Sequence, residues 1–293
     1  SPVDRDAGFA GSADGRIVAF AGRGTNYLPG PIATDATLDV FVSTMTGVSG
    51  VGVGPLQGIN ATRPMVSGDG NTVIFTSSAG TTFLPGFSDP GGAQLFAYRR
   101  NDGSFRLVTH HAGAPLTGTL ADAMPLGIST NGQFVLFRSM APNLVEGQAA
   151  PTVPNIFLGD LDSGTTDLVS HVGGDPSQPT AIYPLFQGMS ADASRVLILS
   201  AGALSGRGGE TAPGYELAES VGDHLFLYDH VRRSSVLVDH KHDSLAHAAV
   251  GGVFSAAISR DGLAVVYSAT SSGIVPGVQS LWNESEVYLY DVT

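Results

Sequence analysis

The sequence predicts an all-β fold of the β-propeller type. One short phrase recurs: a serine, then an Asp-Gly turn, then an apolar strand. Its clearest copy runs from residue 258 to 268, and the other copies begin at Ser12, Ser67, Ser129 and Ser190. Each unit of roughly constant length also has room for four short strands. A repeat of this kind, with four strands per unit, is typical of propeller blades.

The chemistry of the phrase supports a tight turn between two strands. Glycine adopts positive φ without a clash at Cβ, and aspartate can bond to its own backbone. The apolar run that follows, closed by a polar residue, fits a buried strand of about five residues. The copy at Ser190 is looser because Ala193 stands in place of the glycine.

The strands follow in order from this phrase. The strand before the turn is predicted at 63–66, 124–128, 183–189 and 253–258. The strand after it is predicted at 17–21, 72–76, 134–138, 195–199 and 264–268. A third strand is predicted at 38–43, 94–98, 155–158, 224–228 and 287–290. A fourth is predicted at 48–53, 105–109, 166–170 and 235–239. Residues 1–11 are assigned to a lead, and no helix is predicted, because no cap precedes a sustained 3.6-residue period.

The fifth repeat ends before its fourth strand. An unpaired sheet edge is a liability, so we expect residues 2–6 to complete that blade as its outer strand. Residues 1–293 would then form one domain of five four-stranded blades, with repeats at about 7–56, 57–117, 118–177, 178–247 and 248–293. The alternative is part of a ring of six or more blades.

Composition excludes several classes of function. The net charge is −12 and Lys241 is the only lysine, which argues against nucleic acid and anionic lipid as partners. Cysteine is absent, so disulfides, zinc knuckles and a cysteine nucleophile are excluded. No run approaches the ~20 apolar residues that a membrane-spanning helix needs. The chain starts without a charged and apolar leader, so export cannot be read from it directly.

Unit three carries the motifs of a known family most fully. It reads Asn-Leu-Val-Glu-Gly at 143–147, Asn-Ile-Phe-Leu-Gly-Asp at 155–160 and Leu-Val-Ser at 168–170. These motifs resemble the TolB-like (WD-repeat-like) propeller repeats of bacterial envelope proteins. The resemblance implies a secreted, periplasmic or cell-surface location and binding of a protein, glycan or small ligand. It also implies a loop that could bind calcium, here 31–39 with Asp35 and Asp39, although calcium prefers more carboxylates.

Two sets of residues suggest alternative chemistry. His240 and His242, flanked by Asp239 and Asp243, could bind zinc or nickel. Histidine also follows the fourth strand in other repeats, as His110 and His171, which favours inherited repeat sequence over a metal site. A glycosidase needs two carboxylates facing each other. The strands expected to line the channel carry one carboxylate among six polar residues: Asn60, Thr62, Arg63, Asp122, Gln187 and Ser255.

The most individual segments connect the second and third strands. Those of the fourth and fifth repeats carry the candidate ligand-binding residues Arg207, Tyr215, Glu216, Trp282, Asn283 and Glu284. Long loops on a compact scaffold are often functional, and an aromatic ring beside polar groups suits sugar or peptide. The sequence therefore predicts a non-catalytic binding or scaffold propeller with no catalytic residue, metal or cofactor. The alternatives are a carbohydrate-active enzyme using the central channel and a structural spacer in a large surface protein.

Overall fold

The computed structural model describes residues 8–22, 38–44, 47–52, 61–202, 204, 222–270, 272–277 and 285–292. The chain divides into two compact units. Unit 1 comprises Ser1–Glu146 and Leu158–Thr166, and unit 2 comprises Gly147–Phe157 and Asp167–Thr293. The expectation of one domain over residues 1–293 stays a prediction.

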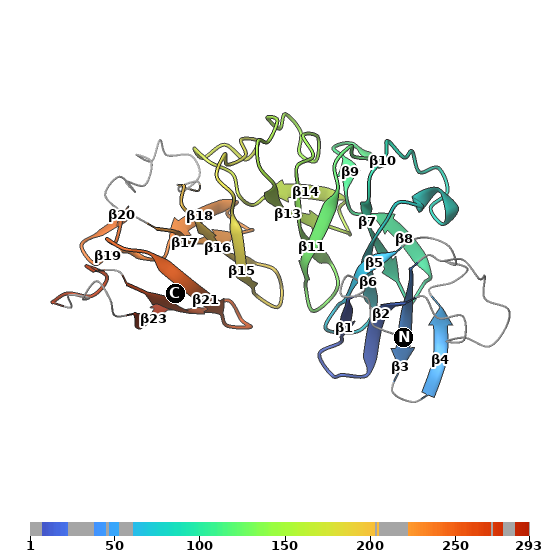
Figure 1. The fold of residues 1–293 in the computed structure, drawn as a ribbon, viewed down its shortest axis with the longest axis horizontal. Coiled ribbons are helices and arrows are strands. Elements are labelled where there is room, and N and C mark those ends of the chain that lie inside the picture. Colours follow the sequence, from blue (N-terminus) through green and yellow to red (C-terminus); the bar gives the residue numbers. More distant parts are fainter. Residues whose placement is uncertain are drawn as a thin grey trace. The chain divides into compact units, whose positions relative to one another are not determined.

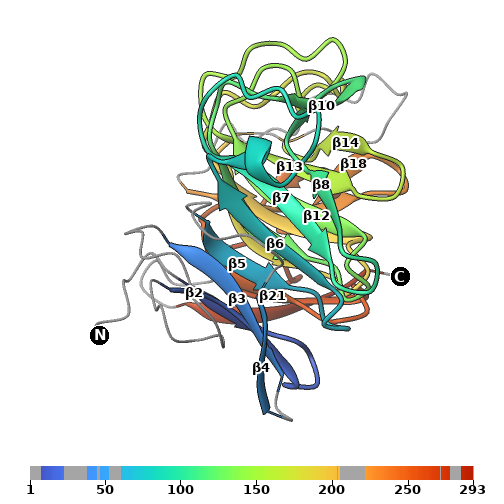
Figure 2. The ribbon, with the colours of Figure 1, turned by 90° about the vertical axis from the view of Figure 1, so that its right-hand side faces the viewer.

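Five antiparallel meanders correspond to the five repeats, and we name the strands of each blade a to d in chain order (Figure 1). Blade 1 is β1 (Phe9–Gly11), β2 (Ile17–Gly22), β3 (Asp39–Thr44) and β4 (Gly47–Gly52). Blade 2 is β5 (Thr62–Val66), β6 (Thr72–Ser77), β7 (Gln94–Arg99) and β8 (Ser104–Leu107). Figure 2 shows the strands of these two sheets from the side.

The remaining blades repeat the same order. Blade 3 is β11 (Ala123–Ile128), β12 (Phe134–Ser139), β13 (Asn155–Asp160) and β14 (Thr165–Leu168). Blade 4 is β15 (Leu185–Met189), β16 (Arg195–Ser200), β17 (His224–Asp229) and β18 (Ser234–Leu237). Blade 5 is β21 (Val253–Ile258), β22 (Ala264–Ala269) and β23 (Glu286–Asp291). Two short hairpins, β9–β10 (His110–His111, Ala114–Gly118) and β19–β20 (His240–Lys241, Ser244–Ala248), follow strands β8 and β18.

The all-β propeller prediction is confirmed, with two differences in detail. Phe9–Gly11, assigned to a lead, is strand a of blade 1 and pairs with β2. The hairpins β9–β10 and β19–β20 were not predicted, because two-residue strands carry no alternating pattern. The single helix in the described residues is a 3-10 turn, Gly80–Thr82. The closing strand at 2–6 lies outside the described residues, so the ring and its blade number stay predictions.

A serine and an Asx side chain build every a–b turn. The Ser hydroxyl donates to the Asx carbonyl or carboxylate oxygen over 2.5–2.7 Å in all five blades. The same Ser oxygen accepts the amide of the fifth residue on, over 2.9–3.0 Å. The Asx oxygen accepts the amide two residues beyond itself. In blade 5, bonds from Ser259 and Leu263 hold the pKa of the Asp261 carboxyl below its ordinary value.

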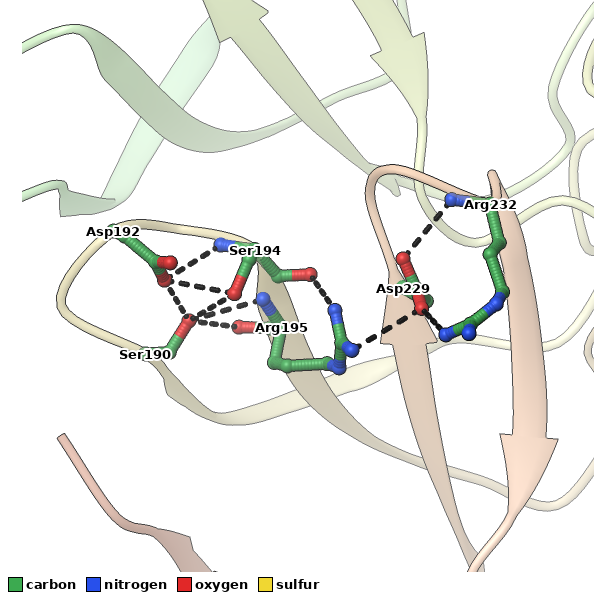
Figure 3. A network of polar contacts seen from close by, with 6 residues as sticks. All are labelled: Ser190, Asp192, Ser194, Arg195, Asp229 and Arg232. Carbon is green, nitrogen blue, oxygen red and sulfur yellow. Dashed lines mark hydrogen bonds and ion pairs between the residues drawn. The ribbon is translucent and has the colours of Figure 1, made fainter. Parts of the chain in front are cut away.

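The looser copy at Ser190 keeps this geometry (Figure 3). Ala193 takes φ +60, the left-handed conformation that glycine adopts at the other turns. Asp192 accepts from the backbone and the hydroxyl of Ser194. Arg195, at the start of strand b, then reaches Asp229 at the end of strand c over 3.3 Å. Three hydrogen bonds to Asp192 therefore hold the turn around Ala193, which is strained at this φ.

The a–b turns also join neighbouring blades within each unit. In unit 1, Ala13 N donates to Gly68 O and Asp69 N donates to Thr130 O, both over 2.9 Å. In unit 2, Ala191 N donates to Arg260 O over 2.8 Å. The turn glycine of the following blade lies directly against strand b of the preceding blade. A Cβ on Gly132 would come within 2.6 Å of Thr72 Cβ.

Aromatic pairs fill the centre of several blades. Strands b and c bring Phe20 opposite Phe41 and Phe75 opposite Phe96, with ring centroids 5.4 and 6.1 Å apart. Phe75 and Phe96 are fully buried. Such cross-strand pairs fix the register, because a shift by one residue would turn both rings to the other face.

The joining role of the turn glycine can be measured. Gly132 and Gly15 occupy the same turn position with φ of +72 and +69, and no atom lies within 4 Å of a Cβ on Gly15. We expect Gly132→Ala to lower the free energy of unfolding by about 1–3 kcal/mol more than Gly15→Ala, because only Gly132 adds a clash to the φ strain. Urea denaturation of both variants tests this, and equal losses would contradict it.

Candidate functional site

The six predicted ligand-binding residues lie outside the part of the chain that the structure describes. They are Arg207, Tyr215, Glu216, Trp282, Asn283 and Glu284. Residues 31–37 of the possible calcium loop and Asn60 are outside it as well. The structure does describe the ends from which the b–c loops leave the sheets. Those ends determine how the loops are held.

A serine at the end of strand b anchors the start of the loop in three blades. Ser77, Ser139 and Ser200 are buried and each accepts the backbone amide two residues further on. The distances are 3.0, 3.1 and 3.1 Å. A side-chain oxygen that takes a backbone amide turns the chain away from the sheet at a fixed point. The loop therefore begins in the same way in blades 2, 3 and 4.

A buried amide at the start of strand c anchors the other end of the loop. In blade 2, Gln94 Nε2 donates to Thr119 O over 2.6 Å, and Gln94 Oε1 accepts from the Thr109 hydroxyl over 2.9 Å. Thr109 in turn accepts the amide of Leu95. Blade 3 repeats the arrangement with Asn155 and Ser170, 2.7 Å apart.

Blade 4 places a histidine and an aspartate at these same two positions. His224 Nδ1 donates to Asp239 Oδ2 over 2.7 Å, and Asp239 Oδ1 accepts the amide of Leu225 over 2.9 Å. The side chains of His224 and Asp239 are 1% and 0% exposed. An imidazole paired with a carboxylate is the base of many hydrolases. Here the pair is sealed from solvent and replaces Gln94–Thr109 and Asn155–Ser170, so its role is structural.

These loop anchors were missed by sequence reasoning, although a signal was present. Aligning the repeats places Gln94, Asn155 and His224 at the first position of strand c, and Thr109, Ser170 and Asp239 two residues after strand d. Polar residues that change identity together at two buried positions indicate a maintained hydrogen bond. The run 239–243 by itself indicates metal ligands, because His240 and His242 lie on one face of an extended chain.

The metal alternative is not supported by the geometry around Asp239. The carboxylate faces His224, while His240 Nδ1 and His242 Nδ1 donate to the carbonyls of Lys241 and Gly273. Among the described residues, no group of three His, Asp or Glu side chains could hold an ion. Asp122 is the one carboxylate among the polar residues that were expected to line the channel of a glycosidase. Its side chain accepts a hydrogen bond from the amide of Ala93 over 2.8 Å, at the end of the b–c loop of blade 2.

A second charged cluster lies in unit 2, between strand d of blade 3 and the c–d turn of blade 4. Asp167 is 3.1 Å from His230 Nδ1 and 3.2 Å from the Arg233 guanidinium. His171 Nε2 donates to the carbonyl of Arg233 over 3.1 Å, and its ring meets Tyr228 edge-on. Burial lowers the pKa of His171, because the charged imidazolium loses hydration. Burial likewise raises the pKa of Tyr228, so its hydroxyl stays protonated.

No helix in the described residues is long and apolar enough to cross a membrane.

The anchor in blade 4 can be tested by exchanging it for that of blade 3. Asp239→Ala leaves His224 Nδ1 and the Leu225 amide buried without partners, which costs about 1–3 kcal/mol for each group. The double variant His224→Asn/Asp239→Ser installs the Asn–Ser pair and should unfold at a higher urea concentration than Asp239→Ala. Asp243→Ala, at an exposed position, is the control. Unchanged stability of Asp239→Ala would overturn the anchor.

Burial of His171 predicts a pH dependence of stability. Above its ordinary pKa of 6.5 neither folded nor unfolded chain binds a proton there. As the pH falls below that value, the unfolded chain is protonated first, so stability decreases by at most about 1.4 kcal/mol per pH unit. We expect His171→Asn to lose less stability than the parent between pH 7.5 and 5.5. The exposed His111→Asn should behave like the parent; equal slopes in all three would contradict the assignment.

No protein-family model matches the chain, and no curated protein matches its sequence. Solved structures do match. The alignment with a prolyl endopeptidase covers 99% of this chain and 34% of that one, with a TM-score of 0.50 and 14% identity. TolB from Acinetobacter baumannii aligns with 91% of this chain, at a TM-score of 0.41 and 14% identity. A putative TolB from Agrobacterium tumefaciens aligns with all of it, at 0.44 and 16%, and 78% of that protein is covered. The chain spans about half, 52%, of the Acinetobacter protein. In fold, the chain is similar to TolB and other β-propeller proteins.

Proposed function

We propose that this chain is a non-catalytic binding propeller that recognises a protein or glycan through its b–c loops. One observation carries the proposal. In three consecutive blades both ends of the b–c loop are fixed by buried, repeat-equivalent hydrogen bonds, while the sequence between them differs in every blade. A rigid frame with variable loops is the arrangement that many binding scaffolds use.

The recognition residues of this proposal are in the loops of blades 4 and 5. Arg207, Tyr215 and Glu216 belong to the first loop, and Trp282, Asn283 and Glu284 belong to the second. Aromatic rings provide contact area at low entropic cost, and the neighbouring charges and amide provide directional bonds for a sugar or peptide. Both loops leave their sheets at the same end of the strands, since each joins the end of strand b to the start of strand c.

The cell envelope is the proposed setting of the partner. The motifs at 143–147, 155–160 and 168–170 that resemble TolB-like repeats support a secreted, periplasmic or cell-surface location. The net charge of −12 favours a neutral or basic partner over nucleic acid or anionic lipid. Catalysis and a bound cofactor are not part of this proposal.

The binding role can be tested on the full chain against purified peptidoglycan fragments, envelope polysaccharides and soluble envelope proteins. We expect one class to bind, and both Trp282→Ala and a Gly-Ser replacement of 207–219 to weaken binding by about tenfold or more, as for loss of a central aromatic contact. Calorimetry measures the dissociation constants.

Two control variants belong in the same experiment. Asn101→Ala and Asp102→Asn alter the c–d turn, at the other end of the sheet, and should bind as the parent does. Binding that survives both loop changes would contradict the loop assignment. New reducing ends released from a polysaccharide would instead favour the carbohydrate-active enzyme, and an absence of any binding would favour the spacer.

A further inference from the structure

Unit 1 contains a cavity of about 320 Å³ beside β8, the d strand of blade 2. Its walls come from β8, the b–c loop of blade 2, the β9–β10 hairpin and the c–d turn of blade 3. Figure 2 labels β8 and β10 in unit 1. Most of the lining is apolar, with Leu84, Phe105, Leu107, Pro115, Leu116 and Leu161. Pockets for small ligands start at about this size.

The cavity is open to solvent and has an unpaired cation at its rim. Arg106, Gly164 and Thr165 line it and are exposed. Within the described residues, Arg106 makes no ion pair or side-chain hydrogen bond, whereas the neighbouring Arg99 and Arg100 pair with Asp162 and with the carbonyl of Gly70. A guanidinium at the edge of an apolar hollow is suited to a carboxylate.

The wall of the cavity also contains a hydroxyl without a partner. Thr166 lines it, and its Oγ1 is buried and has no hydrogen bond in the described part of the chain. A buried polar group of this kind costs free energy unless something bonds to it. A ligand oxygen that reaches Thr166 Oγ1 would supply the missing acceptor.

The other titratable groups of the lining are engaged elsewhere. Asp160 accepts from the Gln133 side chain, the Asp162 amide and the Ser163 hydroxyl. Burial raises the pKa of Asp160, but these hydrogen bonds outweigh it and leave the pKa below its ordinary value. His110 Nδ1 donates to the carbonyl of His111.

Repeat symmetry explains why the space is open. In unit 2 the equivalent space, between strand d of blade 3 and the c–d turn of blade 4, is occupied by Asp167 with His230 and Arg233. The residues at those three positions around the cavity are Arg106, Leu161 and Gly164. Leu161 thus stands in place of His230, and Gly164 stands in place of Arg233. Arg106 stands in place of Asp167, so a cation replaces the carboxylate. In unit 2 the charged side chain of strand d has partners of opposite charge, whereas Arg106 has none among the described residues. A ligand with a carboxylate for Arg106 and an apolar part against Leu161 would complete the space.

We propose that this cavity binds a small apolar carboxylate, of the size of a leucine or phenylalanine side chain, with its anion on Arg106 and Thr166. The apolar body lies against Phe105, Leu107 and Leu161. This site is separate from the b–c loops, and it does not depend on the proposed function. Two sources share the required chemistry: a free acid and the C-terminal residue of a peptide.

The test measures binding of defined probes to the full chain by calorimetry and by chemical shifts of the cavity methyl groups. The probes are 4-methylpentanoate, phenylacetate, and a tripeptide that ends in leucine with a free or an amidated C-terminus. Hexylamine is the cationic control and 4-methylpentanamide is the uncharged control. We expect the acids or the free-terminus peptide to bind and both controls to bind at least about tenfold more weakly.

Three variants locate the site. Arg106→Gln and Thr166→Val should each weaken binding several-fold or more, whereas the exposed Arg260→Gln should not. Gly164→Arg places the side chain found in blade 4 into the cavity and should abolish binding; Arg233 itself takes φ +50 at that position, so the turn accepts arginine. The matched control is Gly103→Arg, in the same turn of blade 2 with φ +69 and no atom within 4 Å of a Cβ.

The outcomes separate cleanly. Preference for the free acids identifies a metabolite-like ligand, and preference for the free-terminus peptide identifies a chain terminus; both support the site. No binding of any acid or peptide at 10 mM, equal binding of the amide or amine, or binding that Arg106→Gln and Gly164→Arg leave unchanged would overturn it.

Discussion

The Ser–Asx turn is the interaction on which the rest of the structure depends. Two side-chain oxygens of the turn accept backbone amides between strands a and b. The turn also offers a backbone amide and a backbone carbonyl for hydrogen bonds to the neighbouring blades of its unit. In blades 2 and 3 its glycine packs against strand b of the preceding blade, where a Cβ would come within 2.6 Å of Ile17 or Thr72. One local motif therefore sets both the hairpin and the packing of one blade on the next.

A fixed frame leaves freedom elsewhere. The turns and the loop anchors bond to the backbone at the ends of the strands in each blade. The b–c loops can therefore differ in sequence without loss of the sheet. These loops lie between Ser77 and Gln94, Ser139 and Asn155, and Ser200 and His224. The His224–Asp239 pair shows how far the anchor itself can vary. A histidine–carboxylate pair stands in blade 4 where amide–hydroxyl pairs stand in blades 2 and 3, because every buried donor still finds an acceptor.

Variation between repeats also changes the spaces between them. Asp167, His230 and Arg233 fill in unit 2 the position that Arg106, Leu161 and Gly164 leave open in unit 1. The two turns share a left-handed residue, since Arg233 and Gly164 each take positive φ before strand d. Differences at three equivalent positions thus separate an ion-paired contact in unit 2 from a cavity in unit 1.

The sequence by itself determined the blade and its strands. The five serine phrases fixed where strands a and b meet, because a turn of this kind depends only on residues close together in the chain. It did not indicate Phe9–Gly11, which is too short for a pattern, or the pairing of His224 with Asp239, which are 15 positions apart. Only tertiary structure could decide that Asp239 and Asp122 are anchors and that a space lies beside Arg106. Burial and the direction of a side chain arise from contacts between distant segments, and those contacts have no local signature.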